Sequence, residues 1–280
     1  MTGPPPLMVE ARRVLLDALE ALRDHRESLV LVGAQAVYLR TEEIELSFSA
    51  SYTTDADLAI DPSTLAEAPP IEQILTEAGF ERIEPDRPGI WGKHVLVDGR
   101  DEVVQVDLIV PESLAGPGRR GARLSGHGKQ AAGRADGLEA AVVDRAAMTI
   151  RSYDATDKRS ITIDVAGPTA LLVAKLHKLS DRVSESDRRP DRLIAKDAAD
   201  SYRLMLHLGI DTAIARFRYL LGQPVASAVT ERALEYLRSL FAAPALAGVR
   251  LAVEGLASDV PSNRVETVCV DFSRSVLERL

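Results

Sequence analysis

The chain has 280 residues, 46% of them hydrophobic, which is enough to bury a core in one large domain or two modest ones. A net charge of −8 and an aromatic content of 4% exclude a protein that is basic over its whole surface or that offers many rings for base stacking. The single cysteine, Cys269, excludes an intrachain disulfide and a cysteine-rich zinc site. No apolar run reaches the roughly 20 residues of a spanning helix, and the start of the sequence lacks a signal-peptide pattern, so we expect a cytoplasmic protein without membrane contact.

Hydrophobic periodicity and turn residues predict the secondary structure. In chain order we expect a helix over 7–26, a strand over 29–32, a glycine turn and helix over 33–40 and a strand over 53–61. A connection from Pro62 then leads into a helix in IEQILTEAGF, closed by Gly79, followed by two strands over 93–99 and 101–111 with a turn at Asp98–Gly99. Strands within 140–154 and 159–168 and helices over 169–183, 195–208, 211–221, 228–241 and 270–280 complete the prediction. This order predicts an α/β (α+β) fold. A mixed sheet with flanking helices is expected over residues 1–165, and a helical domain over 166–280.

Residues 116–137 interrupt these patterns. The segment is rich in glycine, has almost no large apolar side chains, and between Arg119 and Arg134 it carries five Lys or Arg and no acid. In an acidic chain, such a local positive charge favours contact with phosphates. The alternative interpretation is a flexible linker whose charge aids solubility.

Two aspartates, Asp55 and Asp57, lead into an apolar strand pattern. Side chains alternate along a strand, so both would point to the same face with Cα atoms about 6.6 Å apart. Asp107 lies in another apolar strand, and if the two strands are neighbours the three carboxylates converge. Mutual repulsion would then raise a pKa unless a divalent cation is bound, and Mg²⁺, with Mn²⁺ as an alternative, suits carboxylate oxygens. For an isolated D-x-D pattern, a turn residue followed by a solvated strand charge is the simpler interpretation.

Gly33 lies where a strand changes into a helix, a geometry in which backbone N–H groups receive phosphates. A glycine turn, a D-x-D strand and a third acid, here LVGAQAVYLR, TTDADLAI and VQVDLIV, resemble the three motifs of the DNA polymerase beta-like nucleotidyltransferase superfamily. The resemblance implies Mg²⁺ held by Asp55 and Asp57, with Asp107 in support, and an NTP phosphate near Gly33 and Ala34. Ala34 stands where that family usually has Gly or Ser, so a hydroxyl contact to the phosphates is lost.

The second half of the chain contains charged helix faces. In GPTALLVAKLHKLSDRV, Lys175, Lys178 and Arg182 lie beside an apolar stripe, and KDAAD places Asp197 on a later helix. Each helix alone is typical of a solvated charged face. Together they resemble the K-x-x-x-x-x-x-R and K-D-x-x-D signature of the AbiEii/MenT-type toxin nucleotidyltransferases, over about residues 29–206. The resemblance implies a nucleotide-binding role for the three cations, with Lys175 on the triphosphate, and implies that Asp197 completes the active site.

The resemblance implies a Mg²⁺-dependent enzyme that moves NMP from an NTP to an acceptor hydroxyl. The acceptor in the toxin group is RNA, chiefly the 3′ end of tRNA, and a type IV toxin–antitoxin system would add an antitoxin protein as a partner. We expect the RNA backbone to contact the positively charged loop at Arg119, Arg120, Arg123 and Lys129. Two alternatives stay open. One is transfer to a small cationic acceptor such as an aminoglycoside, which the acidic charge suits and the basic loop opposes. The other is a catalytically degenerate binding protein of the same fold.

Overall fold

The computed structural model describes residues 4–44, 53–189, 191 and 193–280. The chain divides into two compact units, each with its own dense internal packing. The first unit consists of the chain up to Gln35 together with Thr53–Ala135 and Arg145–Ala166; the second consists of the described residues that follow Gln35, Asp136–Asp144 and Gly167–Leu280.

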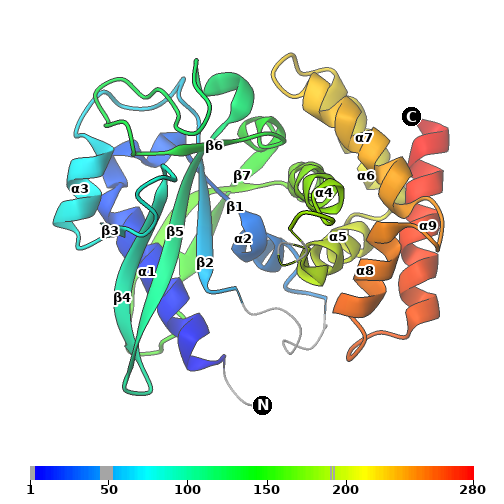
Figure 1. The fold of residues 1–280 in the computed structure, drawn as a ribbon, viewed down its shortest axis with the longest axis horizontal. Helices are drawn as coiled ribbons and strands as arrows, with labels where there is room; N and C mark the ends of the chain where they lie inside the picture. The colour runs from blue at the N-terminus through cyan, green and yellow to red at the C-terminus, as the bar shows by residue number, and fades with distance from the viewer. Residues whose placement is uncertain (1–3, 45–52, 190, 192) are drawn as a thin grey trace. The chain divides into compact units, whose positions relative to one another are not determined.

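A mixed sheet forms the first unit (Figure 1). Among the described residues the strand order is β3-β4-β5-β2-β1-β8-β7, and β6 pairs with β5 outside this path. The strands are β1 (Leu29–Val32), β2 (Asp55–Ile60), β3 (Glu81–Arg82), β4 (Ile90–Val97), β5 (Arg100–Pro111), β6 (Gly133–Ala135), β7 (Arg145–Arg151) and β8 (Ser160–Ala166). The helices of this unit are α1 (Pro6–Ala21), the start of α2 (Gly33–Arg40), α3 (Ile71–Glu77) and the 3₁₀ helices η1 (Arg23–Ser28) and η3 (Glu112–Leu114). The predicted mixed α/β class is confirmed.

One face of the sheet is covered by α1, as Figure 1 shows. Lys93 of β4 pairs in register with Val104 of β5, and its ammonium contacts Asp17 of α1 at 2.7 Å. Since residues paired in register point to the same face, Val104 also faces α1. Asp107, three residues further along β5, therefore lies on the opposite face. All four residues of β1 are buried, as expected for a central strand.

The turn conformations agree with those predicted from the sequence. Asp98 and Gly99 have φ values of 50° and 79°, the conformation of a two-residue hairpin turn between β4 and β5. Gly79, with φ of 80°, closes the chain after α3. The helix predicted in IEQILTEAGF begins at Ile71 as expected, directly after Pro69 and Pro70, which cannot donate the backbone hydrogen bonds of a helix interior.

Two boundaries around the sheet differ from the prediction. The helix expected to reach residue 26 ends at Ala21 and continues as the 3₁₀ helix η1. The strand expected from residue 140 begins only at Arg145, after the 3₁₀ helix η4 (Glu139–Val142), whose alanines are buried in the second unit. Short apolar runs do not distinguish a strand from a buried helical turn, which accounts for the second difference.

The glycine-rich segment is folded onto the sheet. Gly89 N–H donates to the carbonyl of Gln130 at 2.9 Å, and the Trp91 indole N–H donates to the carbonyl of Ala131 at 3.1 Å. The segment then enters β6, which pairs in parallel with the end of β5. These bonds give the segment a defined path against β4 and β5, unlike a free linker.

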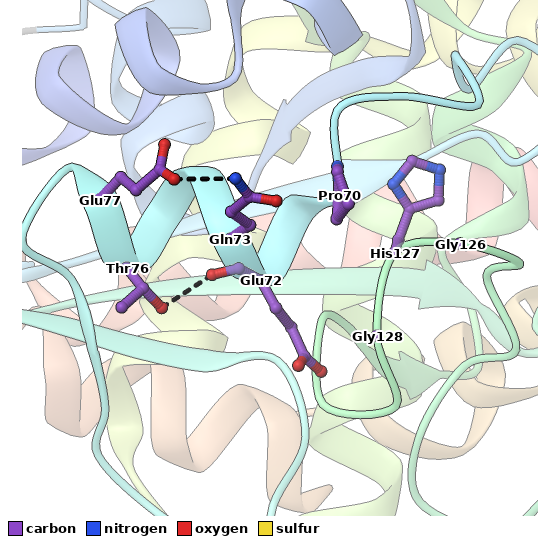
Figure 2. Close-up of a pocket in the computed structure, with 8 residues that line it drawn as sticks. All are labelled: Pro70, Glu72, Gln73, Thr76, Glu77, Gly126, His127 and Gly128. Atoms are coloured by element: carbon purple, nitrogen blue, oxygen red, sulfur yellow. Dashed lines mark hydrogen bonds between the residues drawn. The ribbon is translucent and has the colours of Figure 1, made fainter.

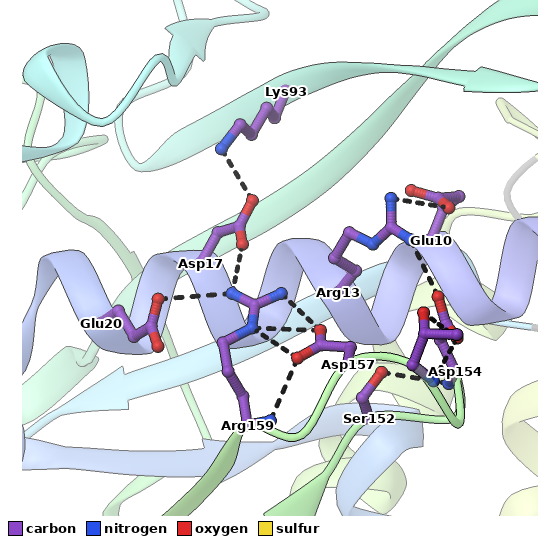
Figure 3. Close-up of polar contacts among 10 residues, drawn as sticks. Glu10, Arg13, Asp17, Glu20, Lys93, Ser152, Asp154, Asp157 and Arg159 are labelled. Carbon is purple, nitrogen blue, oxygen red and sulfur yellow. Dashed lines mark hydrogen bonds and ion pairs between the residues drawn. The ribbon is translucent and has the colours of Figure 1, made fainter.

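A polar network joins α1 to the turn between β7 and β8 (Figure 3). Arg159 contacts Asp17 at 2.6 Å, Asp157 at 2.7 Å and Glu20 at 3.3 Å. Lys93 shares Asp17, so the network reaches β4 as well. Hydrogen bonds with Asp157 raise the pKa of Arg159 above its usual range.

We expect Arg159→Ala to lower the Tm by about 2–4 °C, because one side chain holds three carboxylates in a partly exposed network. Differential scanning fluorimetry in low salt measures this, and the loss should shrink in 1 M NaCl. Arg23→Ala is the control, since the contact of Arg23 with Asp24 is long, at 4.0 Å, and joins two exposed side chains. An equal Tm change in the two variants would contradict the network's role.

Helices form the second unit. They are the part of α2 that follows Gln35, η4, α4 (Pro168–Ser184), α5 (Ala195–Leu208), α6 (Ile210–Leu221), α7 (Ser227–Phe241), α8 (Ala247–Gly255) and α9 (Ser262–Arg279). The predicted helical C-terminal part is confirmed. The sequence interpretation missed α8, a short helix, and started the last helix eight residues late. Within the described residues, no helix combines the length and apolarity needed to cross a membrane.

Candidate functional site

The sheet brings the three predicted carboxylates together. β2 and β5 are parallel neighbours, and Asp57 pairs in register with Asp107. Their Cα atoms are therefore about 4.8 Å apart, with both side chains on the face opposite α1. Asp55 lies two residues earlier on β2 and shares that face. The predicted adjacency of the two strands is present, although about fifty residues separate them along the chain.

Gly33 lies directly against Asp57. Its φ is +69°, and a Cβ at this position would lie 1.9 Å from Asp57 Oδ2. Any other residue would be strained and would also displace the carboxylate. The glycine turn between β1 and α2 thus lets the backbone approach the aspartate strand closely, and Ala34 follows it as a buried residue.

Polar neighbours that the sequence interpretation did not single out hold these aspartates. The hydroxyl of Thr53 donates to the Asp55 carboxylate, and Gln35 Nε2 donates to the Asp55 backbone carbonyl at 3.1 Å. Gln105 Nε2 donates to Asp107 Oδ1 at 2.7 Å. Thr53 and Gln105 are each two residues from an aspartate on an extended segment, and this spacing is the sequence signal that would have found them.

Burial, with the neighbouring charge of Asp57 next in importance, raises the pKa of Asp107 to about 7. An unfolded chain releases this proton near pH 4, so between about pH 4 and pH 7 the folded protein binds more protons than the unfolded one. The stabilisation of the folded state by Asp107 is therefore fully present below pH 4 and is lost as the pH rises through 7.

We expect the free energy of unfolding of the metal-free protein to fall by on the order of 2–4 kcal/mol between pH 4 and pH 8 through Asp107 alone. Asp107→Asn should flatten this part of the pH profile, because asparagine does not titrate. Urea denaturation at several pH values in EDTA measures both proteins. Identical pH profiles for the two proteins would contradict the assignment.

The donor chemistry of the three aspartates fits Mg²⁺ in part. Mg²⁺ is commonly held by one or two carboxylates together with substrate phosphates, and Asp57 and Asp107 are adjacent carboxylates beside a glycine turn. As placed, the described residues contain no group of three or more His, Cys, Asp or Glu side chains that would hold a metal ion without further ligands. The aspartates therefore suit a cation that arrives with phosphate oxygens.

In the second unit, the predicted residues form a buried ionic cluster. Lys175 is 5% exposed, and its ammonium contacts Asp197 at 2.8 Å and Asp200 at 2.6 Å. Arg182 also contacts Asp197, and Lys178 approaches it at 3.9 Å. Burial favours the neutral lysine, but the charges of Asp200 and Asp197 outweigh it and hold the pKa of Lys175 above its usual range.

The contacts within this cluster affect the catalytic and nucleotide-binding roles predicted for its residues. Burial would raise the pKa of Asp197, but the charges of Lys175, Lys178 and Arg182 outweigh it and lower that pKa. Lys175 would reach a phosphate only after giving up a carboxylate partner, so its contact with a triphosphate stays a prediction. Lys178, with 48% of its side chain exposed, is the most accessible cation of the cluster.

The positively charged segment borders an open hollow of about 850 Å³ in the first unit. Arg119, Arg123 and Lys129 line it together with Pro88 and several glycines, and no acidic side chain contributes. Arg120 is exposed but does not line it. The fifth cation, Arg134, turns into the fold and contacts Glu112 at 2.6 Å, so it supports the loop and is not part of the hollow.

A second hollow of the first unit, of about 550 Å³, lies between α3 and the glycine-rich segment (Figure 2). Its polar lining includes Glu72, Gln73, Glu77 and His127, and Gln73 donates to Glu77 at 2.8 Å. None of the predicted site residues lines it.

The site residues are thus distributed over three places. The first unit holds the carboxylate face of β2 and β5 and the basic hollow, and the second unit holds the Lys175 cluster. In comparisons with known proteins, no family model matches this chain, and no curated protein matches it.

Proposed function

We propose that the protein is a Mg²⁺-dependent nucleotidyltransferase that moves NMP from an NTP to a hydroxyl of RNA. The observation that carries the proposal is the register pairing of Asp57 with Asp107, with Asp55 on the same face and Gly33 against Asp57. The resemblance of these motifs to the DNA polymerase beta-like superfamily, and of the helical half to the AbiEii/MenT-type toxins, supports it.

In this reaction, the acceptor hydroxyl oxygen bonds to the α-phosphorus of the NTP, the bond to the β-phosphate bridging oxygen breaks, and pyrophosphate leaves. Asp55 and Asp57 would hold Mg²⁺, with Mn²⁺ as a substitute, and the bound cation would neutralise charge on the phosphates. Asp107 would complete the metal site or accept the proton of the attacking hydroxyl. The turn at Gly33 would bring backbone N–H groups to the phosphates.

The basic hollow supports the proposal that the acceptor is RNA. Its cations come from a segment that joins β6, and β6 pairs with β5 at Ile109, two residues beyond Asp107. The hollow and the carboxylates thus belong to the same unit of the chain. A cationic small acceptor would be repelled there, which favours RNA over an aminoglycoside. As in the toxin group, the acceptor would be a tRNA 3′ end and an antitoxin the partner.

We expect the triple variant Arg119→Gln/Arg123→Gln/Lys129→Gln to bind single-stranded RNA more weakly. Each lost phosphate contact removes about 0.7 from the slope of log affinity against log salt concentration, so the slope should fall by about 2. Fluorescence anisotropy with a labelled oligonucleotide at several salt concentrations measures it, and the KM for the NTP should not change.

A variant of equal charge change is the control for the hollow. Arg23→Gln/Arg26→Gln/Arg82→Gln removes three exposed cations of the same unit that do not line the hollow. If both triple variants lose the same affinity and slope, the hollow does not hold the RNA backbone.

The reaction itself is tested with Mg²⁺, each α-labelled NTP and one of three acceptors: total tRNA, an aminoglycoside, or none. The proposal predicts label on tRNA with release of pyrophosphate. Label on the aminoglycoside alone would support small-molecule transfer. No transfer in any mixture, with NTP still bound, would support a binding protein without chemistry.

A further inference from the structure

A hydrogen-bonded chain of buried side chains runs to Asp55 within the first unit. Arg12 Nε donates to Gln35 Oε1 at 3.2 Å, and Gln35 Nε2 donates to the Asp55 carbonyl at 3.1 Å. Arg12 and Gln35 are only 3% and 5% exposed. A guanidinium only donates and a carbonyl only accepts, so a single orientation of the Gln35 amide satisfies both neighbours.

Arg12 is itself fixed from another side. Its Nη1 donates to the carbonyl of Arg151, the last residue of β7, at 3.2 Å. Its Nη2 donates to the Tyr153 hydroxyl at 2.9 Å, and its guanidinium carbon lies 4.2 Å from the centre of the Tyr153 ring. Helix α1 and the end of β7 therefore both hold the group that orients the Gln35 amide.

The position of Gln35 explains why Asp55 needs this contact. The pairing of β1 with β2 ends at Val32 and Asp57, because Gly33 turns the chain into α2. On the other side, Asp55 pairs with Gln105 of β5. At the Asp55 carbonyl, the side-chain amide of Gln35 provides the hydrogen bond that a longer β1 would have given from its backbone.

We propose that Gln35, oriented by Arg12, is a positioning residue that sets the Asp55 carboxylate for binding of the divalent cation. The inference rests on the proposed function. Asp55 is the first residue of β2, and the chain there is tied by Thr53 through the carboxylate and by Gln35 through the carbonyl. Loss of the amide would let the start of the strand move and would move the carboxylate with it.

Gln35→Leu keeps most of the side-chain volume and removes both hydrogen bonds. We expect it to weaken Mn²⁺ binding by about 10–100-fold, the usual effect of losing a group that orients a metal ligand. Free Mn²⁺ is measured by electron paramagnetic resonance during a titration of the full chain in the presence of a non-hydrolysable NTP analogue. Excess Mg²⁺ should partly restore kcat, while the KM for RNA stays unchanged. Arg12→Lys keeps the charge but alters the donor geometry, so a smaller loss in the same direction is expected.

The control is Ser28→Ala, which removes a buried hydroxyl that donates to the His25 carbonyl at 2.7 Å and does not reach Asp55. It should lower the Tm yet leave Mn²⁺ affinity unchanged. If Gln35→Leu lowers the Tm as Ser28→Ala does and keeps wild-type Mn²⁺ affinity, the positioning role is wrong while the proposed function stands. If wild-type protein with the NTP analogue binds Mn²⁺ no better than Asp57→Asn does, both the proposed function and this inference fall.

Discussion

Asp57→Asn is expected to lower nucleotidyl transfer by on the order of 10³-fold or more. Charge stabilisation by a catalytic metal contributes several kcal/mol to the transition state, and each 1.36 kcal/mol is a factor of ten in rate. Asparagine keeps the shape of the side chain next to Gly33, so the fold should persist. Its metal-free Tm should equal or exceed that of the wild type at pH 8, because the repulsion of Asp107 is relieved. Initial rates with α-labelled NTP and tRNA measure the loss.

Asp164→Asn provides the matched control for this loss. Asp164 is another aspartate of the same sheet, on β8, where it contacts Arg145 at 3.3 Å. Its replacement should leave transfer within about twofold of wild type, since β1 separates its strand from β2 and Asp164 adjoins none of the three aspartates of β2 and β5. Transfer by Asp57→Asn at more than about a tenth of the wild-type rate would contradict a metal-binding role for Asp57.

Lys175→Met is expected to lower the free energy of unfolding of the second unit by about 3–5 kcal/mol. The substitution leaves Asp197 and Asp200 buried with less countercharge, and breaking a buried ion pair by removal of one partner costs this much. Urea denaturation followed by circular dichroism measures the change. Lys178→Ala should alter stability little, since that side chain is half exposed, yet raise the KM for the NTP.

A double variant tests whether the unbalanced buried charge, and not the change of side-chain shape at Lys175, causes the loss of stability. Lys175→Met/Asp200→Leu replaces both members of one buried pair with apolar side chains, and such replacements are often neutral or stabilising. It should therefore regain much of the stability lost in Lys175→Met. If Lys175→Met folds with wild-type stability, the ammonium is not a structural member of the cluster, and the predicted phosphate role gains support.

Much of the carboxylate face could be predicted from the sequence. Period-two alternation put Asp55 and Asp57 on one face, and the two D-bearing strands carried strong apolar patterns. Turn chemistry at Asp98–Gly99 and at Gly79 was also readable, because positive φ values restrict which residues fit.

Other features depend on contacts that no local pattern contains. The parallel pairing of β2 with β5 joins segments fifty residues apart. From the sequence, this pairing was an assumption on which the convergence of the three aspartates depended. The charged faces of α4 and α5 looked solvated or ligand-binding, whereas tertiary packing buries Lys175 against two aspartates. The sequence did not predict a role for Gln35, because a glutamine in a first helical turn matches no motif. Its role follows from the residue at which β1 ends.

The central claim is that Asp55 and Asp57 hold a divalent cation together with nucleotide phosphates. The most direct test is a Mn²⁺ titration at pH 8, followed by electron paramagnetic resonance, with and without a non-hydrolysable NTP analogue. Wild-type protein should bind Mn²⁺ at least tenfold more tightly with the analogue, and Asp55→Asn/Asp57→Asn should abolish this gain. Equal Mn²⁺ binding by the wild type and the double variant would contradict the claim.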